Sequence, residues 1–144
     1  MPASDPNCVF CRILAGVIPC FKIGEDERTV AFLDINPVNP GHALVVTKAH
    51  APTLMAAGDG DLVAVLPMAR RVADAVAQEL RPDGINLLQA NGPGAAQSVP
   101  HFHLHVIPRR LDDGLVMNWE LRPGDKAELA ALAERLRNAM ARIP

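Results

Sequence analysis

The chain has 144 residues, of which 49% are hydrophobic, and its 14 basic and 16 acidic side chains leave a formal net charge of −2. This length suits one globular domain, and the near-neutral charge argues against a protein that coats nucleic acid through a basic surface. No apolar run approaches the ~18 residues of a membrane span, and the polar tail of residues 1–7 has no signal-peptide core, so we expect a cytoplasmic protein without nucleic-acid or membrane partners.

Two short apolar runs in the first third of the chain indicate β-strands. They are residues 29–35 (TVAFLDI) and residues 42–47 (HALVVT). Asn36-Pro37 and Pro40-Gly41 lie between them, and turn residues of this kind interrupt strands. We therefore expect the two strands to form a hairpin with a loop of about six residues.

A long amphipathic helix is predicted next. Beyond Asp59 and Asp61, either of which can cap a helix, apolar residues recur at three- and four-residue spacing up to a Pro-Asp-Gly turn. Pro67 lies within this pattern and predicts either a kink or a later start of the helix. A third strand is expected at residues 85–90, followed by a tight loop at residues 91–94.

One more strand and one more helix complete the predicted elements. Residues 102–107 alternate in hydropathy and indicate a strand that Pro108 ends. Asp125 and Glu128 match a capping box, and the helix after them has an apolar stripe consisting of Leu129, Leu132, Leu136 and Met140. Strands joined mostly by loops, with two helices interspersed, predict an α+β domain with a largely antiparallel sheet.

Three histidines, His101, His103 and His105, alternate with apolar residues along the last predicted strand. Because side chains alternate between the two faces of a strand, the imidazoles share one face and the apolar residues turn into the core. Burying and pairing three imidazoles is costly, which favours a functional explanation. The row is either a metal site or a nucleophilic imidazole whose neighbours fix its tautomer and its protonation.

The segment just before the histidines favours phosphate chemistry. Residues 91–99 (NGPGAAQSV) form a glycine-containing loop whose backbone N–H groups and Ser98 hydroxyl can donate to phosphate oxygens. The loop is not a Walker A motif, because the lysine and the spacing of that motif are missing. A neutral imidazole attacks well near pH 7, and its attack on phosphorus divides one displacement into two steps.

The pattern H-x-H-x-H followed by two apolar residues resembles the signature of the histidine triad (HIT) superfamily of nucleotide hydrolases and transferases. Similar segments occur in the same order and spacing: CVFCRI, TVAFLDINPVNPGHALVVTKAH and the block NG…GAAQSVPHFHLHVIPR. The resemblance implies a HIT-like fold with a single, largely antiparallel five-stranded sheet and two main helices. It also implies one HIT domain over residues 1–144, in which residues 111–144 form a variable C-terminal segment and helix.

The resemblance also implies roles for individual residues. His103 is the central histidine and hence the nucleophile, which forms a nucleotidyl-histidine intermediate that water then hydrolyses. His105 helps to hold the α-phosphate, His42 is a further active-site histidine, and Ser98 passes a proton to the leaving group. Asp34 accepts hydrogen bonds from the ribose hydroxyls. The other nucleotide-binding positions are Asn91, Gln97 and Val99.

Cys8 and Cys11 form a C-x-x-C pair, which suits either a tetrahedral metal ion or a redox couple. No βαβ pattern surrounds the pair, so a thioredoxin-like site is excluded. In bacterial-type members of the family such a pair holds a structural zinc together with two histidines, and the resemblance places these at His50 and His101. Two isolated buried thiols are the alternative. Cys20 is expected to be a small buried residue outside this group.

The resemblance further implies a homodimer whose sheets join across the interface. The implied substrate is an AMP-like purine nucleotide, most simply a purine nucleoside phosphoramidate from which AMP is released. Alternatives from the same family are a dinucleoside polyphosphate hydrolase, a nucleotidyl transferase and a non-catalytic nucleotide-binding adaptor with structural zinc. A metalloenzyme that uses the three histidines as ligands is a further alternative, and it would lose its activity on chelation.

Overall fold

The computed structural model describes residues 2–116 and 119–144, which belong to two compact units, Met1–Gly114 and Leu115–Pro144. None of the helices in these ranges combines the length and the apolar character that a membrane crossing needs. The elements of the first unit, in chain order, are α1 (Val9–Leu14), β1 (Lys22–Glu25), β2 (Thr29–Leu33), β3 (Ala43–Thr47), the 3-10 helix η1 (Leu54–Ala56), α2 (Asp59–Leu80), β4 (Gly84–Leu88), the 3-10 helix η2 (Pro93–Ala95) and β5 (His103–Arg109).

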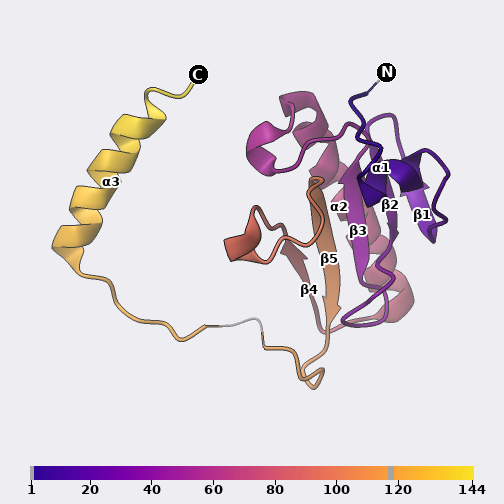
Figure 1. Cartoon of the computed structure of the whole chain (residues 1–144). Coiled ribbons are helices and arrows are strands. Elements are labelled where there is room, and N and C mark those ends of the chain that lie inside the picture. Colours follow the sequence, from indigo (N-terminus) through magenta and orange to yellow (C-terminus); the bar gives the residue numbers. More distant parts are fainter. Residues whose placement is uncertain (1, 117–118) are drawn as a thin grey trace. The chain divides into compact units, whose positions relative to one another are not determined.

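Five antiparallel strands form one open sheet in the order β1-β2-β3-β5-β4 (Figure 1). The predicted α+β class and five-stranded antiparallel sheet are thereby confirmed. β2 and β3 form the predicted hairpin, but its loop spans residues 34–42 and is longer than expected. The strand β2 ends early because the Asp34 carboxylate accepts a hydrogen bond from the backbone N–H of Asn36 (2.8 Å), which begins a turn.

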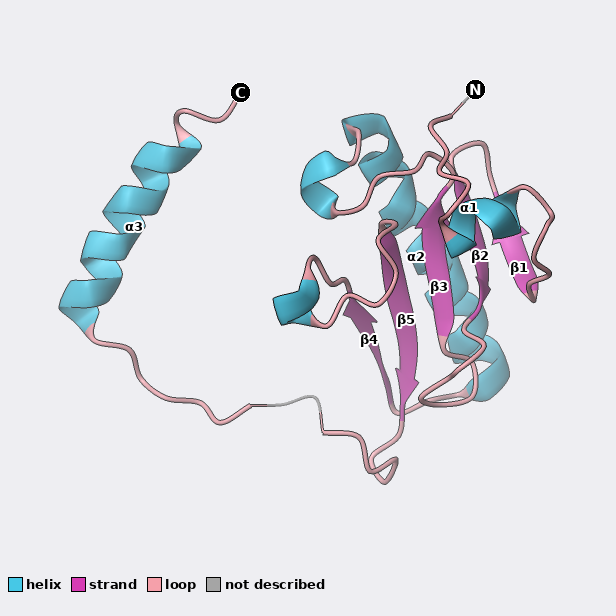
Figure 2. Ribbon diagram, in the orientation of Figure 1, coloured by secondary structure: helices cyan, strands magenta, loops and turns pink. Residues whose placement is uncertain are grey.

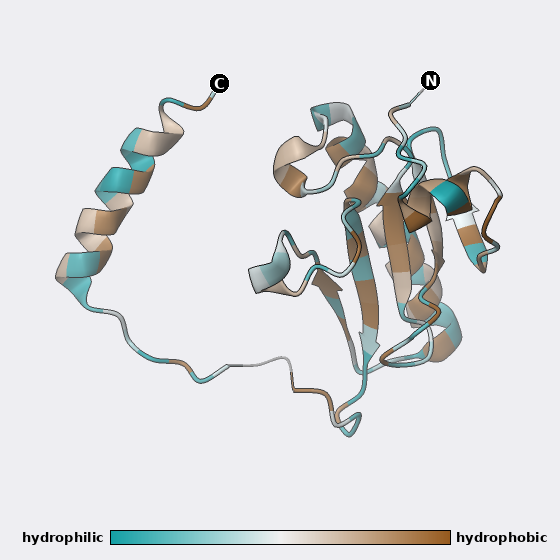
Figure 3. Cartoon of the chain, in the orientation of Figure 1, coloured by the Kyte–Doolittle hydropathy of each residue, from teal (hydrophilic) through white to brown (hydrophobic). Residues whose placement is uncertain are grey.

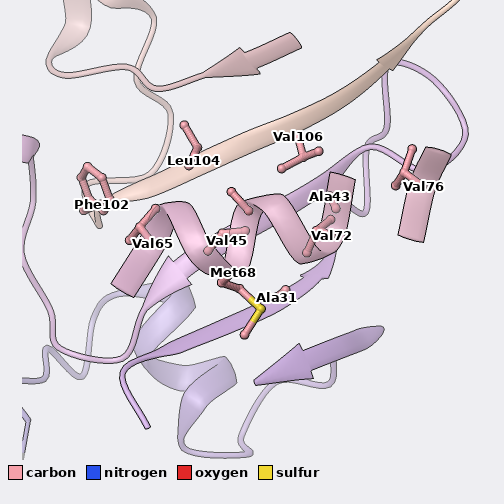
Figure 4. Close-up of a cluster of buried hydrophobic side chains, with 11 residues drawn as sticks. Ala31, Ala43, Val45, Val65, Met68, Val72, Val76, Phe102, Leu104 and Val106 are labelled. Carbon is pink, nitrogen blue, oxygen red and sulfur yellow. The ribbon is translucent and has the colours of Figure 1, made fainter. Parts of the chain in front are cut away.

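The sheet is covered on both faces, by α2 behind it and by α1 in front of it in the view of Figure 2. The central strands are accordingly hydrophobic over most of their length (Figure 3). Figure 4 shows the cluster under α2, which comprises Ala31, Ala43, Val45, Val65, Met68, Ala69, Val72, Val76, Phe102, Leu104 and Val106. The cluster under α1 comprises Cys8, Phe10, Cys11, Val30, Phe32, Leu44 and Val46.

Further predicted boundaries differ from those in the structure, where the strand expected at residues 85–90 is β4 at Gly84–Leu88. Helix α2 begins at Asp59 and runs through Pro67, so a later start is wrong, and Gly58 occupies the N-cap position instead of an aspartate. Strand β5 continues through Pro108 to Arg109. Its pairing with β3 ends at Val106, so at Pro108 the strand has a single neighbour, and a proline is tolerated there.

The second unit contains the predicted C-terminal helix, α3 (Lys126–Met140). The Asp125 carboxylate accepts a hydrogen bond from the backbone N–H of Glu128 (2.9 Å), which confirms the predicted N-cap. The apolar stripe of this helix is exposed. The single-domain prediction for residues 1–144 remains a prediction.

Candidate active site and metal cluster

His103 and His105 lie on the face of β5 that α1 covers, and His101, two residues before the start of the strand, lies against the same helix. His101 is fully buried and His103 is 5% exposed, whereas His105 is half-buried. The Phe10 ring of α1 contacts His101 and His103 edge to face, with ring centroids 5.8 and 5.0 Å apart. The row is therefore held between strand and helix, and the predicted shared face is confirmed.

His103 has the tautomer of a nucleophile. Its Nδ1 lies 2.6 Å from the backbone oxygen of His101. Since a carbonyl oxygen can only accept, Nδ1 carries the proton and Nε2 keeps its lone pair in the neutral ring. Burial lowers the pKa of His103 below its usual value, despite the opposing effects of the His101 carbonyl and of Asp34. The ring is thus neutral near pH 7, with Nε2 as its nucleophilic atom.

His42 and His105 form a hydrogen-bonded pair beside His103. The backbone N–H of Val38 donates to His42 Nδ1 (3.1 Å), so the proton of neutral His42 lies on Nε2. This Nε2 lies 2.8 Å from His105 Nδ1 and 3.5 Å from an Asp34 carboxylate oxygen. His42 therefore donates to His105, whose own proton is left on Nε2.

Both members of this pair are neutral at pH 7. Burial lowers the pKa of His42, although the Asp34 carboxylate opposes the effect. Burial, followed by the neighbouring imidazoles of His103 and His42, lowers the pKa of His105 to about 4. Each of Asp34, His42 and His105 also has an atom that could bind a metal ion, and these atoms lie within 4.8 Å of one another. A metal ion there would have to displace the Nε2 proton of His42, because the Val38 N–H occupies its other nitrogen.

A cavity of about 340 Å³ lies in front of His103. Five predicted site residues line it, namely Asp34, Ser98, Val99, His103 and His105. Its other walls come from α1, the segment before β1 and the end of β2, and they are mostly apolar. Within the described part of the chain, this lining includes neither Lys nor Arg, so Asp34 is its only charged side chain. Cys20 is half-buried in the wall, so the expectation of a small buried residue is wrong.

The remaining predicted nucleotide-binding residues are bonded within the protein. The Asn91 side-chain oxygen accepts from the backbone N–H of Leu54 (2.7 Å). The Gln97 side-chain oxygen accepts from the backbone N–H of Gly92 (2.7 Å), and its amide donates to the backbone oxygen of Pro52 (2.6 Å). These contacts set the shape of the loop that carries Ser98. Direct contact of Asn91 and Gln97 with phosphates stays a prediction.

The second cluster contains the four predicted metal ligands, Cys8, Cys11, His50 and His101. Their donor atoms all lie within 4.8 Å of one another. His101 Nδ1 lies 3.3 Å from Cys8 Sγ, 3.6 Å from Cys11 Sγ and 3.2 Å from His50 Nδ1, and Cys11 Sγ lies 3.5 Å from His50 Nδ1. Ligand bonds of about 2.0–2.1 Å to nitrogen and 2.3 Å to sulfur set tetrahedron edges of roughly 3.3–3.8 Å, so the four residues fit a zinc ion.

Hydrogen bonds around this cluster orient its nitrogen and sulfur atoms as metal binding requires. His101 Nε2 lies 2.7 Å from the backbone oxygen of Thr47 and must donate to it, which leaves the Nδ1 lone pair facing the thiols. The backbone N–H of Asp5 points at Cys11 Sγ (3.4 Å), as it would toward a thiolate ligand. The same histidine cannot then also bind a phosphate, so the row is divided between the two sites.

Sequence reasoning missed the contribution of α1 to the cavity. Val9, Phe10 and Ile13 of this helix line the cavity, and Phe10 also packs on the nucleophile. The sequence feature that could have revealed this contribution is the C-x-x-C pair, because Val9 and Phe10 lie between its two cysteines. If both cysteines are anchored to the histidine strand, the residues between them must lie next to it.

The domain family described as the HIT domain matches residues 15–112. Adenosine 5'-monophosphoramidase of Schizosaccharomyces pombe is 39% identical over 131 residues, which are 90% of this chain and 96% of that protein. A HIT family protein from Bacillus anthracis has a TM-score of 0.87 at 37% identity, covering 94% of this chain and 99% of its own. A zinc-bound histidine triad family protein from Mycobacterium smegmatis has a TM-score of 0.73 at 36% identity, with coverages of 92% and 97%.

Proposed function

This chain belongs to the HIT family, and from that premise we propose that it is a nucleotide hydrolase that releases AMP from purine nucleoside phosphoramidates through His103. The observation that carries the proposal is the tautomer of His103, whose Nε2 lone pair is available in the wall of a nucleotide-sized cavity. The similar protein of Schizosaccharomyces pombe, named an adenosine 5'-monophosphoramidase, supports the same substrate class.

The reaction has two displacements at phosphorus. In the first, His103 Nε2 attacks the α-phosphorus, the P–N bond to the leaving amine breaks, and the Ser98 hydroxyl passes a proton to that amine. His105, whose proton lies on Nε2, donates to a non-bridging phosphate oxygen and stabilises the charge that develops there. In the second, water attacks the same phosphorus and gives up a proton that restores the Ser98 hydroxyl, the bond to His103 breaks, and AMP leaves. Asp34 accepts hydrogen bonds from the ribose hydroxyls.

The charge of the cavity supports an amine as the leaving group. A dinucleoside polyphosphate would bring several additional negative charges into a lining that, among the described residues, has a carboxylate but no cationic side chain. A phosphoramidate brings only the charge of its α-phosphate, which the histidine pair and the backbone N–H groups can accommodate. Phosphoramidates therefore match the site better than polyphosphates.

A structural zinc ion belongs to this proposal, with Cys8, Cys11, His50 and His101 as its ligands. When bound, zinc supplies folding energy and no reaction chemistry, because all four positions of its tetrahedron are taken by protein. The cysteines then tie α1 to the histidine strand, and Phe10 is kept against His103. The zinc-bound relative from Mycobacterium smegmatis supports this assignment.

A homodimer is proposed from the free edge of the sheet at β4. Val63 and Leu66 of α2 and Leu87 and Leu88 of β4 are large apolar side chains with 43–73% exposure. Leu66 and Leu87 line one open groove between helix and strand. An unpaired edge strand next to an apolar patch favours pairing with a second copy. A cytoplasmic location completes the proposal and rests on the sequence expectations alone.

A substrate panel tests the proposed activity. Adenosine phosphoramidates and dinucleoside polyphosphates are offered to the wild type and to His103→Asn, and AMP binding is measured in parallel by calorimetry. We expect the wild type to prefer the phosphoramidate, and His103→Asn to bind AMP while losing roughly 10³-fold or more in kcat. Wild-type rates in this variant would disprove the mechanism. AMP binding without turnover by the wild type would leave the adaptor alternative, and loss of turnover on brief chelation of folded protein would point to a metalloenzyme.

A further inference from the structure

A buried carboxylate lies at the far end of β5, outside the lining of the cavity. The Asp113 side chain is 6% exposed. Its oxygens accept hydrogen bonds from Arg109 Nε (2.7 Å), from the backbone N–H of Arg110 (3.0 Å) and from Asn39 Nδ2 (3.0 Å). The last of these contacts joins the end of the histidine strand to the loop between β2 and β3.

Asn39 connects this carboxylate to the histidine pair. Its side-chain amide also donates to the backbone oxygen of Pro108 (2.8 Å), so it is held to β5 at two points. Its own backbone oxygen accepts from the N–H of His42 (3.1 Å). The residue before it, Val38, supplies the N–H that donates to His42 Nδ1. The anchored residue therefore lies within the turn that fixes the His42 ring.

We propose that Asn39 and Asp113 act as positioning residues for the reaction proposed above, on which this inference rests. They hold the turn of residues 38–42 against β5, so that the Val38 N–H keeps His42 in the Nε2–H tautomer. Only this tautomer donates to His105 Nδ1 and leaves the His105 proton on Nε2, where the phosphate needs it. Neither residue lines the cavity.

The physical argument concerns the choice between two tautomers. If the turn of residues 38–42 loosens, the Val38 N–H no longer holds the lone pair on Nδ1, and the proton of His42 can occupy either nitrogen. With the proton on Nδ1, two lone pairs would face each other across the 2.8 Å between His42 and His105. His105 would then move or change its own tautomer, and its donation to the phosphate would be lost.

Asn39→Ala tests this inference in the full-length chain, with Asp112→Asn as the control. The expected result is a loss of roughly ten- to a hundredfold in kcat with KM almost unchanged, because Asn39 lies outside the lining of the cavity. Nitrogen-15 NMR of the imidazoles should show the Nε2–H form of His42 in the wild type and a mixture of tautomers in the variant. Asp112 is an exposed carboxylate next to Asp113, and its amide variant should behave as the wild type in both assays.

A second variant, Asp113→Asn, guards against a folding defect in the first. It removes the charge from the anchor but keeps its shape, and it should shift kcat and the His42 tautomer in the same direction. The two changes in one chain should cost little more than the larger single change, since both act through one contact. Unchanged kcat and an unchanged His42 tautomer in folded Asn39→Ala would overturn the inference. Absence of turnover in the wild type would contradict the proposed function instead, and the NMR comparison would still decide the role of the anchor.

Discussion

At the scale of single residues, the chemistry of this site is set by backbone groups. The carbonyl of His101 accepts from His103 and so keeps its proton on Nδ1, and the N–H of Val38 donates to His42 Nδ1 and so leaves its proton on Nε2. The carbonyl of Thr47 accepts from His101 Nε2, so that His101 Nδ1 faces the thiols. Three chemically identical side chains thereby take three different roles. The division of labour follows from where each ring meets the main chain.

The pKa of His105 leads to a prediction about pH. Burial, followed by the neighbouring imidazoles, lowers this pKa from 6.5 to about 4, so protonation of His105 should leave kcat/KM unchanged at pH 6.5 and reduce it only as the pH approaches 4. Between pH 6.5 and pH 4, His105 binds a proton in the unfolded chain but not in the folded one. The free energy of unfolding therefore falls as the pH drops below 6.5. Urea titrations and steady-state rates at each pH measure both effects. Half-loss of kcat/KM near pH 6.5, in protein that circular dichroism shows to be folded, would contradict the assignment.

How far the sequence predicts the site depends on the range of the contacts involved. Strict alternation of His101, His103 and His105 predicts their shared face, because a strand has a period of two. The tautomers are not predictable in this way, because alternation does not show which backbone group each ring nitrogen meets, and the group that fixes His101 is the carbonyl of Thr47, 54 residues away. Asp113 gave no signal either, because one of two neighbouring aspartates after a strand resembles an ordinary solvated turn.

At the scale of elements, α1 connects the two sites of the molecule. It carries Cys8 at its N-cap and Cys11 within it, and it presents Phe10 to the nucleophile. A helix of six residues has little stability alone, so contacts at its ends must hold it in place. The sequence patterns missed α1 for the same reason, since six residues are too few to show a helical period. They missed β1 because its four residues are mostly exposed.

Loss of a cysteine ligand tests the role of α1. Cys11→Ala should reduce the zinc content from one ion per chain to near zero and lower the melting temperature by at least about 5 °C, because the tie between α1 and β5 is lost. Elemental analysis of protein purified without added zinc and a thermal melt provide the measurements. Cys20→Ala is the matched control, since Cys20 lies outside the cluster, and it should keep its zinc. Equal zinc content in the wild type and Cys11→Ala would contradict the proposed metal site.

Gly41 shows how tightly the loop between β2 and β3 packs on its neighbours. The residue has a φ of +90°, and an added Cβ would overlap Leu80 Cδ1 and lie 3.2 Å from Pro108 Cγ. Gly41→Ala should therefore destabilise the fold by about 2 kcal/mol and reduce kcat, because His42 is the next residue. Urea unfolding measures the change. Gly84→Ala, where no atom lies within 4 Å of the added Cβ, should leave the stability almost unchanged, and equal effects of both changes would refute the packing argument.

At the scale of the whole molecule, the sheet order leaves β4 at an edge while the histidine strand β5 lies next to it. Partner contacts at this edge would therefore stiffen the strand that carries the nucleophile. The family resemblance predicts the five-stranded sheet and its assembly, and the structure confirms the sheet. The proposed assembly would depend on side chains such as Leu66 and Leu87, whose exposure cannot be read from an amphipathic pattern, because such a pattern identifies only the face toward the core.

Sedimentation analysis tests the proposed dimer. The wild type should sediment as a dimer, and the double variant Leu66→Arg with Leu87→Arg as a monomer, since two cations would be buried in an apolar contact. Val17→Arg places a charge on an equally exposed apolar residue outside this groove, and it should remain dimeric. A wild-type chain that is monomeric at micromolar concentration would exclude the assembly.

The central claim is that His103 bonds covalently to the nucleotide during turnover. Enzyme in excess over an adenosine phosphoramidate is quenched in alkali within one turnover, digested and sequenced by tandem mass spectrometry. The account predicts an adenylyl group on the peptide that contains His103, located at that imidazole, and its absence in His103→Asn. An adduct on another residue, or turnover without any adduct at the earliest quench times, would contradict it.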